Sequence, residues 1–354
     1  MSDCRRRRRA TAAAAGVATR GAGYKRLLPC WSLSPFGWIV DRGLARAATG
    51  LVVVLALGGC SAEPAGVVDP VRVGTGPEVE GQLLAAVTDA LLVEAGLAVE
   101  IENFASAESA REALELGRVD LVPAYTGATW LEVHGRADPS GSPRTSWEEV
   151  QALDARRGLS WLQPPFEDEG PPGAPANATF AFVVQPDVGL ATMSQLATRL
   201  GEEPDALVCV DQQFGARADG LQAVLDAYRV SYDREFVAAD AGEAVAGVAG
   251  GDCLAGLTTA TDGRAWEAGL VPLVDDLEVF PAFVVSLVLR DEATIGHPGL
   301  VTAVTPLVDH LTTALLREWN GRVVAGETMD LVAIDVAVDL LVAAGRRSPA
   351  PTGT

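Results

Sequence analysis

Strand-like and helix-like segments alternate from residue 71 onward, and this alternation constrains the fold more than any other feature of the sequence. Residues 71–74 have the pattern of a short strand, and the next segment places apolar side chains at helical spacing before it ends at Gly96. A second strand pattern follows, and then a helix for which Ser109 and Glu112 predict a capping box. Residues 119–122 form a third, buried strand pattern. Strands joined through helices pair in parallel, so the sequence predicts an α/β fold.

A second α/β set follows two loops that are rich in Pro, Gly and Ser, at 138–143 and 164–175. This set covers about 180–280 and is followed by a strand pattern at 281–289 and helical patterns as far as residue 341. The repetition of the alternation predicts more than one layer of sheet and helix in a chain of 354 residues.

The first 59 residues differ in charge from the rest of the chain. They carry ten basic and two acidic side chains, a net charge of +8, whereas the whole chain has a formal charge of −20, so the remainder carries −28. A body this acidic repels polyanions, which excludes nucleic acid as a partner.

The basic segment leads into an apolar run that ends at Cys60. The run is about 13 residues long, too short to span a bilayer as a helix. A basic region, a short apolar core and then small residues are typical of a secretory signal that is removed. The sequence Leu57-Gly58-Gly59-Cys60 resembles a bacterial lipobox, in which the cysteine is lipidated and becomes the mature N-terminus. An ordinary cleaved signal and an unmodified buried cysteine are the alternatives.

These features predict the ends of the mature protein. We expect a signal peptide at 1–59, a lipidated tether at 60–70 and a disordered tail at 346–354. The protein would then be extracytoplasmic and anchored to the cell membrane by lipid at Cys60.

Two cysteines, Cys209 and Cys253, remain in the folded body, since Cys4 and Cys30 lie in the predicted signal peptide. An exported protein meets an oxidising compartment, and both body cysteines lie in short apolar runs that have the pattern of core strands. We expect them to form a disulfide. Two separate buried thiols are the alternative.

No set of residues in the sequence points to an enzyme. His134, His297 and His310 are scattered, and none has a metal-ligand spacing with a cysteine or another histidine. There is no Gly-x-Ser-x-Gly motif, and the only lysine, Lys25, lies in the predicted signal peptide. We therefore expect no catalytic residue, no metal and no cofactor.

Aromatic side chains fall at the ends of several predicted strands, and Tyr125, Phe180 and Phe283 are the main examples. Ligands of open α/β sheets bind beyond the carboxyl ends of the strands. Aromatic rings gathered there can enclose an apolar or quaternary ammonium group. Arg217 follows a strand at a helix start, where it could hold a carboxylate. Core packing for the rings and a surface ion pair for Arg217 are the alternatives.

Six short motifs stand in the order typical of one family of binding proteins. They are Gly117-Arg118-Val119-Asp120-Leu121-Val122-Pro123-Ala124-Tyr125-Thr126-Gly127, 159–164, 177–181, 217–220, 260–264 and 280–283. With these motifs the chain resembles, over roughly 71–345, the substrate-binding lipoproteins of osmoprotectant ABC importers, the OpuAC-like branch of type II periplasmic binding proteins.

The resemblance implies a two-domain type II periplasmic-binding-protein fold. Each domain is a mainly parallel sheet flanked by helices, and the ligand cleft lies between the domains. Domain one would comprise 71–178 and 285–345, and domain two 179–284.

The resemblance also implies an aromatic ligand cage to which Tyr125 contributes from domain one, Arg217 and Thr259 from domain two, and Phe180 and Phe283 from near the hinge. The residues that match the family's ligand-binding positions are Tyr125, Thr126, Phe180, Arg217, Thr259 and Phe283. The match is partial, because Phe180 and Phe283 occupy tyrosine positions and Thr259 stands where a fourth tyrosine is usual. Gly76 stands where many members have a lysine.

The function that the resemblance implies is the capture of a quaternary ammonium osmoprotectant, such as glycine betaine or choline, and its delivery to a membrane permease. The protein would act as a monomer. The altered cage positions leave two alternatives: a different small solute, such as an amino-acid-like compound, or a sensory or assembly lipoprotein that has lost its ligand. The acidic body favours the approach of a cation over that of an anion.

Overall fold

A computed structural model of the chain describes residues 69–347 apart from short gaps. The gaps are 167–170, 172, 174, 204, 212–213, 216–219, 231–236 and 239. The predicted signal peptide, Cys60 and Arg217 lie outside the described residues, as does the predicted tail from residue 348 onward.

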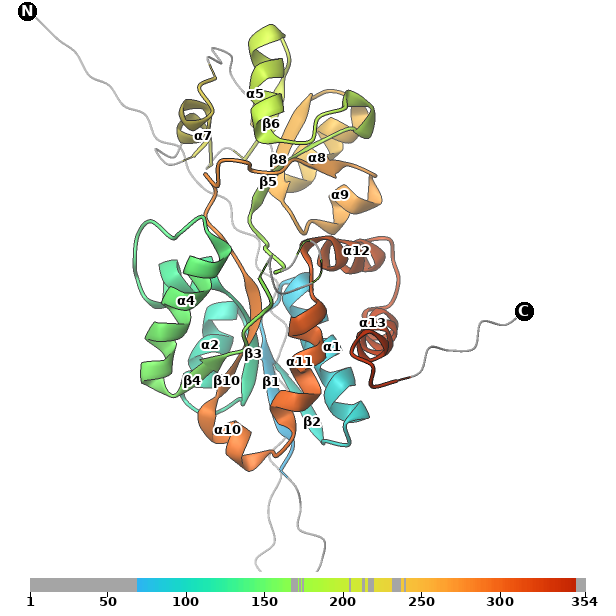
Figure 1. Ribbon diagram of the computed structural model, residues 1–354. Helices are drawn as coiled ribbons and strands as arrows, with labels where there is room; N and C mark the ends of the chain where they lie inside the picture. Colours follow the sequence, from blue (N-terminus) through green and yellow to red (C-terminus); the bar gives the residue numbers. More distant parts are fainter. Residues whose placement is uncertain are drawn as a thin grey trace, which may run out of the picture. The chain divides into compact units, whose positions relative to one another are not determined.

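The first sheet has five strands in the order β2-β1-β3-β10-β4 (Figure 1). The strands are β1 Val71–Thr75, β2 Val99–Asn103, β3 Leu121–Tyr125, β4 Leu159–Trp161 and β10 Val285–Arg290. Strand β1 pairs in parallel with β2 and β3, whereas β10 is antiparallel to β3 and β4. All strands except β10 therefore share one direction.

The second sheet also has five strands, in the order β7-β6-β8-β5-β9. They are β5 Phe180–Val184, β6 Val208–Val210, β7 Val237–Ala238, β8 Ala255–Thr259 and β9 Val271–Pro272. Strand β6 is parallel to β7 and β8, and β5 is antiparallel to β8 and β9. In each sheet the reversed strand is the one that the chain enters from the other sheet, without a crossover helix of its own. The predicted α/β fold with mainly parallel sheets is confirmed.

Helices flank both sheets (Figure 1). Those of the first sheet are α1 Val79–Glu94, α2 Ala107–Glu115, α3 Thr126–Ala128, the π-helical turn η1 Thr129–Val133, α4 Pro143–Asp154, α10 Asp291–Gly296, α11 Leu300–His310, α12 Thr313–Val324 and α13 Met329–Ala343. Those of the second are α5 Met193–Glu202, α7 Leu221–Ala227, α8 Ala241–Gly250 and α9 Gly263–Glu267. Within the described residues, none of the helices has the length and apolar character needed to cross a bilayer.

The first sheet is apolar on both faces, because helices cover each one. Val73, Leu121 and Leu289 are fully buried in a core shared with α1, α11 and α13. Their strand neighbours Val122 and Val288 point to the other face, into a core shared with α2 and Trp161. This two-sided burial explains why the strands have short apolar runs with little alternation.

The start of α2 differs from the prediction. Ser106 is the N-cap, and the capping box joins it to Ser109, whose backbone N–H donates to the Ser106 hydroxyl at 3.1 Å. Ser109 therefore closes the box at the third helical position instead of opening it. The helix begins one turn earlier because the small, polar residue needed at an N-cap is available at Ser106.

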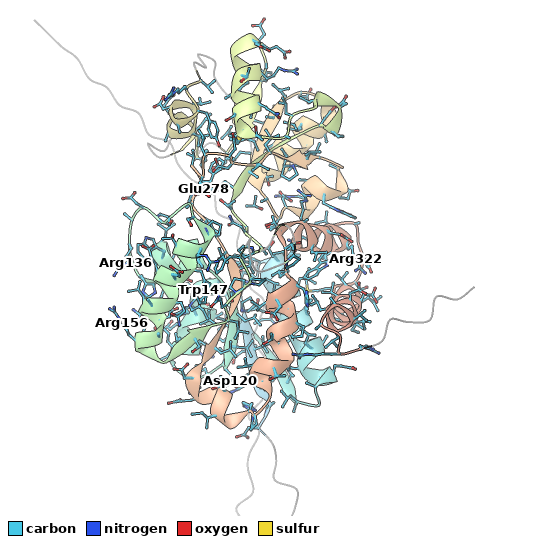
Figure 2. All side chains as sticks on the ribbon, viewed as in Figure 1. Asp120, Arg136, Trp147, Arg156, Glu278 and Arg322 are labelled. Carbon is cyan, nitrogen blue, oxygen red and sulfur yellow. A yellow bond between two sulfur atoms is a disulfide. The ribbon has the colours of Figure 1, made fainter. Side chains whose placement is uncertain are left out.

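Asp120, which is labelled in Figure 2, connects three strands of the first sheet. Its side chain is almost fully buried and accepts hydrogen bonds from the Arg72 backbone at 2.9 Å and from the Arg72 guanidinium at 3.0 and 3.2 Å. Arg290, at the end of β10, lies 3.7 Å from the same carboxylate. This aspartate of the 117–127 motif therefore has a structural role in aligning β1, β3 and β10.

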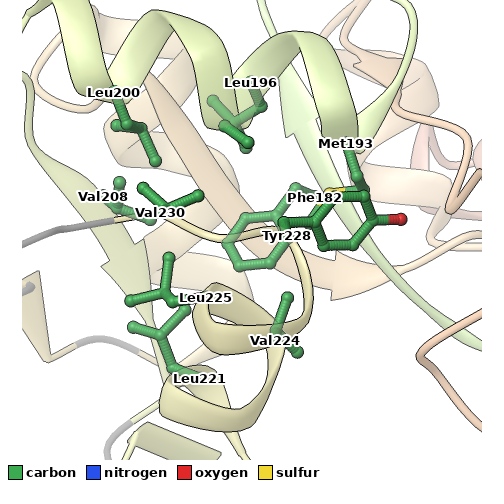
Figure 3. A pocket seen from close by; sticks show the side chains of 11 residues that line it. Phe182, Met193, Leu196, Leu200, Val208, Leu221, Val224, Leu225, Tyr228 and Val230 are labelled. Carbon is green, nitrogen blue, oxygen red and sulfur yellow. The ribbon is translucent and has the colours of Figure 1, made fainter. Parts of the chain in front are cut away.

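The second sheet has an apolar pocket between α5 and α7 (Figure 3). Met193, Leu196 and Leu200 face Val224 and Leu225 across it. Its volume is about 20 Å³, room for about one water molecule. The pocket is therefore a packing gap in the core and is too small for an organic solute.

Cys209 and Cys253 are joined by a disulfide, with their Cα atoms 5.9 Å apart. The bond links β6 to the segment that follows α8, and both residues are buried in the same small core with Val183 and Val248. It closes a loop with a sequence separation of 44. A cross-link of this length restricts the unfolded chain and stabilises the fold.

We predict that replacing both cysteines by alanine lowers the free energy of unfolding by about 2 to 4 kcal/mol. Denaturant titration of the double variant Cys209→Ala/Cys253→Ala measures this loss. Wild type treated with a reductant should approach the stability of the double variant, which should itself be insensitive to reductant. Equal stability of oxidised wild type and the double variant would contradict the prediction.

Candidate functional site

A pocket with charged and aromatic walls lies at the carboxyl ends of strands from both sheets. Its volume is about 770 Å³. The walls include Thr75 at the end of β1, Tyr125 at the end of β3 and Thr259 at the end of β8. The start of α1, the β8–α9 turn, Phe283, Asn320 of α12 and Glu132 also line it. Ligand sites of α/β sheets form at such strand ends.

Glu80 is the centre of a hydrogen-bond network in this pocket. The Tyr125 hydroxyl donates to Glu80 Oε1 at 2.8 Å, and Asn320 Nδ2 donates to Glu80 Oε2 at 2.5 Å. The same amide nitrogen donates to the backbone carbonyl of Thr261 at 2.9 Å. Glu80 lies in α1 and Tyr125 in β3, next to the first sheet, whereas Thr261 follows β8 of the second sheet. The Asn320 amide therefore links a segment of the first sheet to a segment of the second.

Burial raises the pKa of Glu80 above its ordinary value, although hydrogen bonds from Thr261, Tyr125 and Asn320 oppose the rise. Burial also raises the pKa of Tyr125 well above its ordinary value, and the adjacent Glu80 adds to this effect. Tyr125 therefore keeps its proton at neutral pH and acts as a donor to Glu80.

Two glycines allow α9 and α12 to pack backbone against backbone beside this network. A Cβ atom on Gly263 would lie 2.4 Å from the Asn320 carbonyl carbon. One on Gly321 would lie 2.2 Å from a ring atom of Trp266. Neither position has room for a side chain, and this close approach brings Asn320 within reach of Thr261.

Asp262 and Arg264 form a pair at the N-terminus of α9. Asp262 accepts hydrogen bonds from the Arg264 backbone at 2.8 Å and from its guanidinium at 2.7 and 3.0 Å. Burial alone would raise the pKa of Asp262, but Arg264 and Thr258 lower it below its ordinary value. The positive charge of Arg264 is therefore largely neutralised within the pocket wall.

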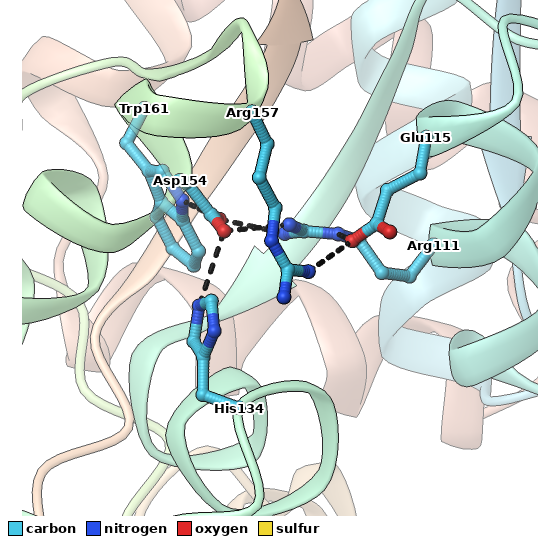
Figure 4. Close-up of polar contacts among 6 residues, drawn as sticks. All are labelled: Arg111, Glu115, His134, Asp154, Arg157 and Trp161. Atoms are coloured by element: carbon cyan, nitrogen blue, oxygen red, sulfur yellow. Dashed lines mark hydrogen bonds and ion pairs between the residues drawn. The ribbon is translucent and has the colours of Figure 1, made fainter.

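A buried network of polar side chains lies next to the π-helical turn η1 (Figure 4). This turn carries Glu132, which lines the pocket. Asp154 is fully buried and accepts from the Arg111 guanidinium at 2.7 and 2.8 Å and from Trp161 Nε1 at 2.7 Å. His134, which directly follows η1, lies 3.1 Å from the same carboxylate. The network thus joins α2, α4 and β4 to the π-helical turn that carries Glu132.

The structure brings three of the predicted ligand-binding residues together: Tyr125, Thr259 and Phe283 all line the pocket. Phe180 lies next to Phe283, with ring centroids 6.4 Å apart in an edge-on arrangement, but is not itself in the wall. Thr126 is fully buried, and its hydroxyl accepts from the Val284 backbone at 3.0 Å and from Ser146 at 2.7 Å. Contact of Thr126 or Phe180 with a ligand stays a prediction, and their positions favour a supporting role.

Sequence reasoning missed Glu78, Glu80 and Asn320, which all line the pocket. Acidic residues at a helix start are common because they favour the helix dipole, so Glu78 and Glu80 carry no distinctive signal. Asn320 is separated from Glu80 by 240 residues in the chain. Within the described ranges, no group of three metal-ligating side chains occurs.

Two mixed sheets that are flanked by helices and share a pocket at their strand ends are the architecture of a type II periplasmic binding protein. Over residues 69–336 the chain matches the family described as the substrate-binding domain of ABC-type glycine betaine transport systems, and it belongs to that family. The expected family is confirmed. Its members are solute-binding proteins of ABC transporters and not enzymes.

Curated relatives and solved structures agree with this assignment. The chain is 29% identical to the glycine-betaine-binding protein of Pseudomonas aeruginosa, over 75% of this chain and 86% of the relative. It is 26% identical to the carnitine transport binding protein OpuCC of Listeria monocytogenes, over 71% and 80%. The structure of apo YehZ from Escherichia coli matches with a TM-score of 0.69 at 25% identity, over 79% of this chain and all of that one.

We predict that Asp154→Asn lowers the free energy of unfolding by about 3 to 5 kcal/mol, because it removes the fully buried one of the two carboxylates that pair with Arg111. Glu115→Gln is the matched control, since Glu115 binds the same Arg111 from a more exposed position. That change should cost less than about 1 kcal/mol. Denaturant titration compares the variants, and equal losses would contradict the role given to Asp154.

We also predict that Glu80 makes stability depend on pH in a defined direction. A carboxyl whose folded-state pKa lies above its ordinary value of 4.5 stabilises the fold below that pH, and this contribution is lost as the pH rises through the folded-state pKa. The free energy of unfolding of wild type, relative to that of Glu80→Gln, should therefore fall as the pH rises from 4.5 through the folded-state pKa of Glu80. Urea titrations at a series of pH values measure it, and a difference that is constant or grows with pH would contradict the prediction.

Proposed function

We propose that the protein is the extracytoplasmic binding component of an ABC importer for quaternary ammonium osmoprotectants such as glycine betaine, choline or carnitine. The observation that carries the proposal is the pocket in which the rings of Tyr125 and Phe283 stand beside several carboxylates. Aromatic faces and nearby negative charge are what a permanent cation without hydrogen-bond donors requires. The family and the names of the curated relatives support the same class of solute.

The anchoring and delivery steps belong to the same proposal. Cys60 would carry the lipid that holds the protein at the outer face of the cell membrane, and the bound solute would pass to a membrane permease. The protein would act as a monomer and without a cofactor. Lipid at Cys60 keeps the acidic body near a membrane that would otherwise attract it little.

Solute capture would proceed by closure of two domains, 71–178 with 285–345 and 179–284. Tyr125 and Glu80 would contact the solute from one domain, and Thr259 from the other. A solute that contacts both domains favours the arrangement in which they are close, which is a hinge closure. Micromolar affinity needs about −8 kcal/mol, of which two cation–π contacts supply on the order of 1 to 4. Desolvation and shape must supply the rest.

We predict that the mature protein binds at least one trimethylammonium compound and that Phe283 contributes through its π face. Phe283→Leu keeps an apolar side chain but removes the ring, so affinity should fall by about 2- to 30-fold. Phe283→Tyr restores the family's usual residue and should retain binding. Isothermal titration calorimetry with choline, glycine betaine and carnitine measures these affinities.

A neutral isostere provides the control for charge. 3,3-Dimethyl-1-butanol has the shape of choline without the positive nitrogen, so it should bind more weakly than choline if cation–π attraction operates. Absence of binding by every trimethylammonium compound would overturn the proposed function. Equal affinities of choline and the isostere would overturn the cage and leave only shape as the basis of recognition.

A further inference from the structure

The described charged side chains that line the pocket are mostly acidic. They are Glu78, Glu80, Glu132, Asp262 and Arg264. The guanidinium of Arg264 is engaged by Asp262, as described above. Three carboxylates therefore face the pocket without a basic partner among its described lining residues.

Glu78 occupies the space beside Gly76. A Cβ atom on Gly76 would lie 2.3 Å from Glu78 Oε2 and 2.7 Å from the backbone nitrogen of Ala107. The side chain of Glu78 could rotate away, but the Ala107 backbone could not, so this position does not accept a longer residue such as lysine. The wall at the end of β1 therefore presents a carboxylate in place of a cation.

Glu80 adds negative charge at a more buried point of the same wall. Its oxygens are held by Tyr125 and Asn320, so the carboxylate cannot turn away from the pocket without breaking these bonds. The negative charge of Glu78 also contributes to the raised pKa of the Tyr125 hydroxyl. A second carboxylate, brought by a ligand, would meet like charge at this wall, from the exposed Glu78 and the more buried Glu80.

We propose that this pocket selects organic cations over zwitterions, with Glu78 and Glu80 as the residues that read the charge of the solute. The inference rests on the proposed function and narrows it: the preferred solute has a quaternary ammonium group and no carboxylate. Choline and glycine betaine test this directly, because they share the trimethylammonium group and differ in bearing a hydroxymethyl or a carboxylate group.

Calorimetry on the full mature protein at neutral pH compares the two solutes. Wild type should bind choline at least about tenfold more tightly than glycine betaine. Glu78→Gln should reduce this ratio several-fold, and Glu78→Lys should reduce it further or invert it, because each step makes the wall less negative. Glu318→Gln is the matched control: Glu318 is exposed on α12 and outside the pocket, so its loss of charge should leave the ratio unchanged.

The outcomes separate this inference from the proposed function. If no trimethylammonium compound binds wild type, the proposed function fails. If glycine betaine binds more tightly than choline, or if Glu78→Lys leaves their ratio unchanged while its melting temperature shows an intact fold, the inference fails and the function stands. Arg217→Ala supplies the opposing test, since a loss confined to glycine betaine, with Glu78 variants unchanged, would mean that Arg217 reads the solute's charge.

Discussion

The structure around the pocket depends on one buried carboxylate, that of Glu80. A charge taken out of water is costly unless donors replace the lost hydration, and here Tyr125, Asn320 and Thr261 do so. These donors come from β3, from α12 and from the turn after β8. Satisfying Glu80 thus fixes three segments that are far apart in the chain, and it does so at the wall where a solute would bind.

The packing of α9 on α12 is the steric counterpart of this network. Gly263 and Gly321 remove the side chains that would hold the two helices apart. The Asn320 side-chain amide can then donate to both Glu80 and the Thr261 carbonyl. Because both of these groups are acceptors, the amide nitrogen, and not the amide oxygen, must face them. The cost is that Asn320 Oδ1 is buried and has no hydrogen-bond partner among the residues that the structure describes. An orphaned acceptor of this kind persists only where the rest of the network compensates for it.

The sequence was sufficient to predict the fold class, because buried parallel strands and amphipathic helices have distinct periods. The strands around Val73 and Val122 were predicted from their apolar runs, and Gly96 was recognised as the stop signal of α1, which ends two residues earlier at Glu94. The reversed direction of β5 and β10 was not predicted, since strand direction depends on how the chain crosses between sheets and not on local pattern. The start of α2 was misplaced because Ser106 and Ser109 are both good capping residues, and only the geometry decides between them.

The candidate site was harder to predict than the fold for a related reason. Tyr125, Thr259 and Phe283 could be placed because they fall at strand ends within recognisable motifs. Glu80 and Asn320 could not, because their role arises from contact between residues 240 positions apart. A glutamate in the first turn of a helix and an asparagine in a later one are both ordinary in isolation.

The phenylalanine at position 180, one of the predicted ligand-binding positions, is explained by the rings around it. Phe180 packs against Phe214, Phe280 and Phe283 with ring centroids 5.3 to 6.4 Å apart. A tyrosine hydroxyl directed into such a cluster would need a hydrogen-bond partner that these rings cannot supply, so phenylalanine is the more stable choice there. The cluster in turn supports the Phe283 ring at the pocket wall, and a pre-positioned ring loses less side-chain entropy when a solute binds. The polar groups of the pocket wall come from Tyr125, Thr259 and the carboxylates.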